Sequence, residues 1–167
     1  MGSVQFVALV WRWCLGMLRV SLPWIFCRGY MCIIGCIEGR CIEALISHCR
    51  WVYGVRWVDF VTEPGMVKAL LQEEKVGYIG GNAVVSVKKH SSIAVGIAAH
   101  SDCGGNPEND ETQKRQLIDA LRVVESFEFL IPTVLMFVHV ERWWDKVEVV
   151  DTRAIAEIRT KKKARTH

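Results

Sequence analysis

The chain has 167 residues, of which 51% are hydrophobic and 23% charged, and its formal net charge at pH 7 is +3. This length suits one domain with a substantial buried core, and the composition excludes an intrinsically disordered chain. The charge is uneven, because residues 1–30 hold three basic residues and no acid, while residues 151–167 hold six basic residues and two acids. Residues 31–150 then contain 12 basic and 16 acidic residues, a net charge of −4. An acidic core without a basic stripe argues against nucleic-acid binding.

The first 30 residues are rich in Trp, Val and Leu, but Arg12 and Arg19 interrupt the apolar run. No uncharged stretch therefore reaches the roughly 18 residues of a membrane-spanning helix. A signal peptide would carry its basic residues before the apolar region, not within it. Contact with a membrane surface is compatible with this composition but not favoured. We predict a hydrophobic N-terminal extension of unclear role over residues 1–30, a folded domain over 31–150 and a basic C-terminal tail over 151–167.

The first half of the predicted domain alternates between strands and helices. The apolar run 31–36 predicts a strand, and apolar residues at helical spacing over 42–49 predict a helix. β-branched and aromatic residues predict a second strand over 55–61. A turn at Glu63-Pro64-Gly65 precedes a predicted helix over 66–71.

The second half continues the alternation. Gly80-Gly81 predicts a turn, with Asn82 as the N-cap of a short helix to His90. The apolar run 92–99 predicts a third strand. Asn109 or Asp110 is expected to cap the clearest helix, which presents Leu117, Ala120, Leu121 and Val124 on one face. Apolar residues predict a fourth strand over 133–140 and a fifth over 147–150.

Strands that are apolar along their whole length and alternate with helices are typical of a parallel sheet that is covered on both faces. We therefore expect an α/β fold with a mostly parallel sheet of four to five strands and helices on both faces. Ligands of such sheets bind beyond the carboxyl ends of the strands, where the strand order reverses.

Three candidate metal ligands follow two of these strands. Cys36 ends the first strand, and His100-Ser101-Asp102-Cys103 follows the third, just before Gly104-Gly105. Two cysteines and a histidine form a ligand set that zinc prefers, with a fourth position left open for water. The alternative is two buried thiols and a hydrogen-bonded core histidine. Cys32, Cys41 and Cys49 fit no iron–sulfur spacing and are expected to pack in the core.

These motifs carry a resemblance to a known family. Cys36-Ile37-Glu38-Gly39-Arg40 after one strand, with His100-Ser-Asp-Cys103-Gly after a later one, resembles the β-class carbonic anhydrases. The stretch Val61-Thr-Glu-Pro-Gly65 and the loop His-Ser-Asp-Cys-Gly-Gly-Asn-Pro resemble a subgroup of short carbonic-anhydrase-like proteins. The likeness covers roughly residues 31–150.

The resemblance implies a β-carbonic-anhydrase-like fold in which strand one lies between strands two and three. It implies Zn²⁺ on Cys36, His100 and Cys103, and a homodimer. The implied activity is reversible hydration of carbon dioxide to bicarbonate by a zinc-bound hydroxide. Glu38 and Arg40 are the implied catalytic pair, in which the arginine holds the acid off the metal so that it orients the water.

The chain departs from the family pattern at Glu38, where most β-class enzymes carry Asp. One extra methylene moves the carboxylate by roughly an ångström. The residue then either pairs with Arg40 or reaches the zinc as a fourth ligand, which would make a non-catalytic zinc-binding protein. A third alternative is a plain surface ion pair at a helix start. Hydrolysis of carbonyl sulfide or carbon disulfide is the alternative activity.

The seven cysteines include no C-x-x-C pair and no spacing typical of a small secreted scaffold. We therefore expect reduced thiols and a cytoplasmic location. The expected partner is a small-molecule substrate, not a nucleic acid.

Overall fold

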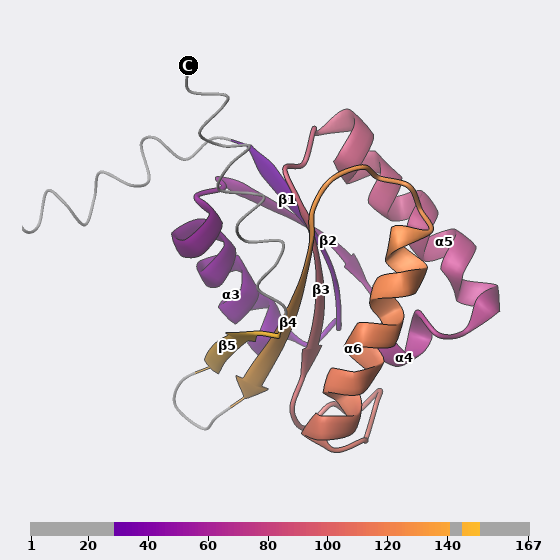
Figure 1. Ribbon diagram of the computed structural model, residues 1–167. Helices are drawn as coiled ribbons and strands as arrows, with labels where there is room; N and C mark the ends of the chain where they lie inside the picture. Colours follow the sequence, from indigo (N-terminus) through magenta and orange to yellow (C-terminus); the bar gives the residue numbers. More distant parts are fainter. Residues whose placement is uncertain (1–28, 141–144, 151–167) are drawn as a thin grey trace, which may run out of the picture.

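The computed structural model describes residues 29–140 and 145–150. These residues form a five-stranded sheet with the strand order β2-β1-β3-β4-β5, and helices cover both of its faces (Figure 1). The predicted α/β fold with a mostly parallel sheet is confirmed. Except for Gly29 and Tyr30, the predicted extension 1–30 lies outside the described residues, as does the predicted tail 151–167. The two boundaries therefore stay predictions.

The elements follow the predicted alternation of strands and helices. In chain order they are β1 (Tyr30–Gly35), α3 (Gly39–His48) with the π-helical turn η1 (Cys49–Tyr53), β2 (Trp57–Thr62), α4 (Met66–Ala69), α5 (Glu73–Val84) with the π-helical turn η2 (Val85–Lys89), β3 (Val95–His100), α6 (Asp110–Glu125), β4 (Thr133–Val140) and β5 (Asp145–Val149).

β1 lies between β2 and β3, and the candidate ligands are at the ends of β1 and β3. It pairs in parallel with β2 on one side and with β3 on the other, as the family resemblance implied. β3 pairs in parallel with β4, whereas β5 returns antiparallel to β4. The chain thus moves from β1 outward to β2 and then back across β1 to β3. The strand order reverses between β1 and β3.

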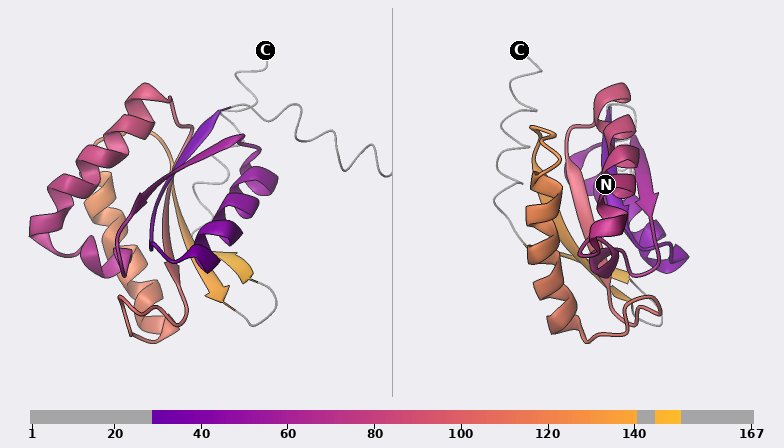
Figure 2. Two further views of the ribbon diagram at one scale, coloured as in Figure 1. Left: turned by 180° about the vertical axis from the view of Figure 1, so that it is seen from behind. Right: turned by 90° about the vertical axis from the view of Figure 1, so that its right-hand side faces the viewer.

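Residues of β1, β3 and β4 alternate between two apolar clusters, one on each face of the sheet. Ile34 and Ile97 belong to the cluster under α4, α5 and α6, and Ile33 and Ala98 belong to the cluster under α3. The two views of Figure 2 show these helices separated by the sheet. Strands buried on both faces need apolar residues at every position, which explains why the sequence shows apolar runs and not alternation.

The long helix α6 begins and packs as the sequence predicted. The side chain of Asn109 accepts a hydrogen bond from the backbone N–H of Thr112 at 2.9 Å, which makes Asn109 the N-cap. Leu117, Ala120 and Val124 are at most 1% exposed and face the sheet. The helix therefore anchors the segment that follows the His100–Cys103 loop.

The prediction that a helix starts at Asn82 is wrong. α5 begins at Glu73 and runs through Gly80, Gly81 and Asn82 to Val84. A Cβ atom at Gly80 would lie 2.9 Å from the ring of Phe127, so this glycine lets the helix approach the loop after α6. Tertiary packing, with Ile79 and Ala83 buried beside it, outweighs the local turn signal of two glycines.

No helix in residues 29–140 and 145–150 is both long enough and apolar enough to cross a membrane.

Candidate metal centre

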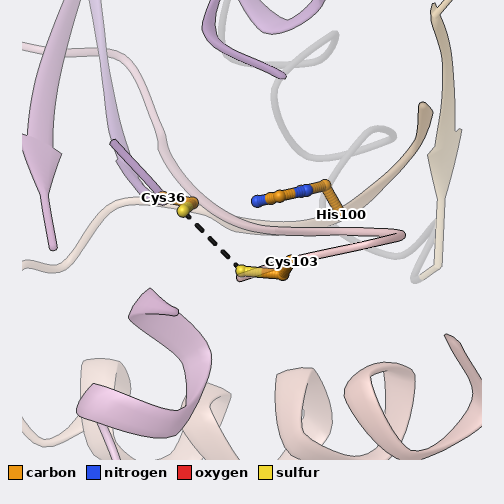
Figure 3. A group of neighbouring side chains, drawn as sticks. All are labelled: Cys36, His100 and Cys103. Carbon is orange, nitrogen blue, oxygen red and sulfur yellow. Dashed lines mark hydrogen bonds between the residues drawn. The ribbon is translucent and has the colours of Figure 1, made fainter. Parts of the chain in front are cut away.

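Three side chains meet at the carboxyl ends of β1 and β3, where the strand order reverses. Cys36 directly follows β1, and His100 is the last residue of β3. Asp102 has a φ of 54°, and the chain turns there so that Cys103 comes back toward the sheet. Figure 3 shows the imidazole of His100 pointing toward Cys36, with Cys103 next to them. Parallel neighbouring strands thus bring together residues 67 positions apart.

The donor atoms of these three residues lie within 4.8 Å of one another. The two sulfur atoms are 3.8 Å apart, and none of the three residues is more than 6% exposed. His100 donates a hydrogen bond from Nδ1 to the carbonyl oxygen of Ser101 at 2.8 Å, so in the neutral imidazole Nε2 carries the lone pair. This buried Nε2 has no hydrogen-bond partner. A core histidine packed for structure would satisfy that atom, whereas a metal ligand needs it free.

The pKa values of the two thiols are shifted in opposite directions. Burial alone would raise the pKa of Cys36, but the imidazole of His100 and the backbone N–H groups of Gly65 and Glu38 together lower it to about 7. Burial and the neighbouring Cys36 thiolate raise the pKa of Cys103. Two thiolates at this separation repel each other, and a divalent cation between them removes the repulsion. The donor set therefore fits a metal ion.

Two glycines allow the loops around the site to touch backbone to backbone. Gly65 has a φ of 60°, and a Cβ atom placed on it would lie 2.4 Å from the carbonyl oxygen of Gly105. A Cβ atom on Gly105 would lie 2.5 Å from the nitrogen of Gly65. This contact holds the loop after β2 against the loop that carries Cys103. It also places the Gly65 N–H beside the sulfur of Cys36.

Glu38 and Arg40 lie at the rim of this group. Glu38 is the N-cap residue of α3, yet its side chain makes no capping hydrogen bond. One carboxylate oxygen accepts a hydrogen bond from Nε of Arg40, and the other lies 3.6 Å from Nε2 of His100. The carboxylate therefore spans the distance from the arginine to the ligand cluster. The predicted Glu38–Arg40 ion pair is present. A terminal guanidinium nitrogen of Arg40 also lies 3.8 Å from a carboxylate oxygen of Asp102.

The sequence alone indicated no role in the site for Gly65, Ser101 or Asp102. The Pro-Gly pair marked Gly65 as a turn residue, but nothing local indicated that the turn would contact Cys36. The remaining described cysteines, Cys32, Cys41 and Cys49, lie in the two apolar clusters and are not part of the three-ligand group. Burial raises the pKa of each of these three thiols to about 12.

The fold and the site define an α/β protein with a three-ligand group suited to a metal ion. A family model described as "Putative carbonic anhydrase" matches residues 27–151, and the chain belongs to this family. The chain is similar to the crystal structure of β-carbonic anhydrase isoform I from the protozoan Trichomonas vaginalis, with 13% identity, a TM-score of 0.45, and coverage of 90% of this chain and 98% of that one.

It is also similar to the crystal structure of the β-carbonic anhydrase CafA from the fungus Aspergillus fumigatus. The identity is 14% and the TM-score 0.41, with 94% of this chain and 93% of that chain covered. No curated protein matches the chain.

Proposed function

We propose that this protein is a zinc-dependent carbonic anhydrase that hydrates carbon dioxide reversibly to bicarbonate. The observation that supports this proposal best is the buried Cys36–His100–Cys103 group with an unpaired imidazole nitrogen. Three protein ligands leave a fourth position open, as in catalytic zinc sites. When bound there, zinc would supply a Lewis acid that lowers the pKa of a water molecule.

The two thiolates and the neutral imidazole together balance the charge of a divalent cation. Such a neutral site acidifies water less than a site of three histidines does, so a neighbouring group has to help. Among the described residues, Glu38 is in position to give this help. One of its carboxylate oxygens faces His100, and Arg40 holds the other. In this role Glu38 accepts a hydrogen bond from the reacting water, and Arg40 keeps the carboxylate oriented.

A specific observation favours a second candidate function. The free oxygen of Glu38 lies only 3.6 Å from the ligand atom of His100. A small side-chain movement would let it occupy the fourth position, which would make the site closed and non-catalytic. The Glu38→Ala variant discussed below separates this candidate from the enzyme. The homodimer and the cytoplasmic location stay predictions.

The test is the zinc content of the full chain after native purification, followed by stopped-flow assay of carbon dioxide hydration. Cys103→Ala removes one proposed ligand. Cys49→Ala is the matched control, because Cys49 is equally buried but packs in the core under α3. We expect about one zinc per chain in the unsubstituted protein and in Cys49→Ala, and almost none in Cys103→Ala.

Zinc binding with hydration activity in the first two proteins, and neither in Cys103→Ala, supports the proposal. A folded protein that cannot be loaded with zinc contradicts it. Zinc binding without hydration contradicts the substrate but not the metal, and carbonyl sulfide and carbon disulfide are then assayed in the same samples.

A further inference from the structure

The hydrogen bonds around Ser101 depart from the regular pattern of the sheet at the place where β3 ends. The last β3–β4 pair is His100 with Val138. The N–H of Ser101 still donates to the carbonyl of Val138 at 3.0 Å, as the parallel ladder requires. Continuing this register would pair Ser101 with His139. The carbonyl of Ser101 would then accept a hydrogen bond from the N–H of Val140.

The carbonyl of Ser101 is used differently here. It accepts the hydrogen bond from Nδ1 of His100 at 2.8 Å. The N–H of Val140 donates instead to the side-chain oxygen of Ser101, also at 2.8 Å. The hydroxyl therefore takes the place that the carbonyl of the same residue would have in the ladder. Because buried or half-buried backbone N–H groups need an acceptor, the carbonyl is released from β4 only where another acceptor replaces it.

We propose that Ser101 is a positioning residue for the metal centre, whose hydroxyl satisfies Val140 and thereby frees its own carbonyl to orient His100. This inference deepens the proposed function, and it rests on His100 being a metal ligand.

The hydrogen bond to the carbonyl of Ser101 selects the tautomer of the neutral His100 side chain. A carbonyl oxygen can only accept, so it fixes the proton of the neutral imidazole on Nδ1 and leaves the lone pair on Nε2, the atom that faces the two cysteines. Without the hydroxyl, Val140 competes for the carbonyl, and the imidazole loses its fixed orientation. Loss of such a supporting contact typically lowers metal affinity by about 10- to 100-fold.

The test compares Ser101→Ala with Ser101→Thr, which keeps the hydroxyl. Ser126→Ala is the control, because it removes another serine hydroxyl that bonds the backbone, here by donating to the carbonyl of Val123 at the far end of α6. The first measurement is the tautomer of His100 in the zinc-free proteins, by long-range ¹H–¹⁵N correlation with ¹⁵N-labelled histidine and with His100→Asn for assignment. The second is zinc affinity, by competition with a chromophoric chelator.

We expect the Nδ1–H tautomer in the unsubstituted protein, in Ser101→Thr and in Ser126→Ala, and mixed tautomers with about 10- to 100-fold weaker zinc binding in Ser101→Ala. Ser101→Ala that keeps both the tautomer and the affinity would overturn the inference. If Ser101→Ala does not fold, the unsubstituted protein decides, because a predominant Nε2–H tautomer there overturns it as well. A folded protein that binds no zinc refutes the proposed function, while the tautomer of His100 still reports on Ser101.

Discussion

The carboxylate of Glu38 lies close to three features of the structure: the start of α3, Arg40 and His100. At the N-cap of α3 its carboxylate lies near the positive end of the helix dipole, it pairs with Arg40, and its second oxygen faces His100. Asp, Asn, Ser and Thr are the usual N-cap residues, because a short side chain reaches back to the backbone. The longer side chain of Glu38 reaches the ligand cluster instead. The carboxylate therefore lies toward the ligand cluster and makes no hydrogen bond to the helix cap.

The variant Glu38→Ala tests whether this carboxylate acts in catalysis or closes the site. If it accepts a hydrogen bond from the reacting water, we expect kcat to fall by about 100-fold or more while zinc content is unchanged. The measurement is stopped-flow hydration together with zinc per chain. Glu111→Ala is the control, because Glu111 is an exposed acid on α6 that pairs weakly with Arg115.

The opposite outcome is equally informative. If activity rises or first appears in Glu38→Ala, the carboxylate is a fourth ligand in the unsubstituted protein, and the non-catalytic candidate is correct. The conservative change Glu38→Asp then shows whether the shorter acid restores an open site.

At the scale of single elements, α5 depends on its glycines in different ways. Gly77 and Gly81 have no atom within 4 Å of an added Cβ, whereas Gly80 faces the ring of Phe127. All three are inside the helix, where glycine costs about 0.5–1 kcal/mol relative to alanine. Of these three glycines, only Gly80 lies where an added Cβ atom would meet a neighbouring side chain.

We therefore expect Gly77→Ala to stabilise the protein by about 0.5–1 kcal/mol, because it lowers the entropy of the unfolded chain and opens no clash. Gly80→Ala is expected to destabilise it by about 1–3 kcal/mol, because Phe127 or the helix has to move. Urea unfolding midpoints measure both. A Gly80→Ala protein as stable as Gly77→Ala would show that the contact with Phe127 does not require glycine.

For the whole molecule, the proposed metal joins segments that are distant in the chain. Cys36 belongs to the end of β1, and His100 and Cys103 belong to the end of β3 and its loop. An ion held by both would bind the native state far better than the unfolded chain. Metal binding and folding stability are then thermodynamically linked.

This linkage predicts that a strong chelator lowers the melting temperature of zinc-loaded protein by several degrees. At a free zinc concentration 100 times the dissociation constant, binding adds about 2.7 kcal/mol to the free energy of unfolding. The measurement is thermal unfolding by circular dichroism with and without chelator. Cys103→Ala is expected to show no chelator effect, and an equal decrease in that variant would indicate that the chelator acts elsewhere.

The sequence by itself determined the order of the elements and the three candidate ligands. Apolar runs over 31–36, 92–99 and 133–140 predicted strands because residues buried on both faces leave a continuous apolar signal. Asn109 predicted the start of α6 because capping is a local interaction. The pairing of Glu38 with Arg40 was expected only because the motif around Cys36 resembles that of the β-class carbonic anhydrases.

Only the tertiary structure decided the features that depend on contacts between distant segments. The helix through Gly80 and Gly81 packs Gly80 against Phe127, which lies 47 residues further along the chain and outside any local window. The contact of Gly65 with Gly105 and the exchange of acceptors at Ser101 likewise depend on how neighbouring loops and strands meet. Local patterns report on propensity and burial, whereas the atoms that complete a site are set by packing, which no short stretch of sequence contains.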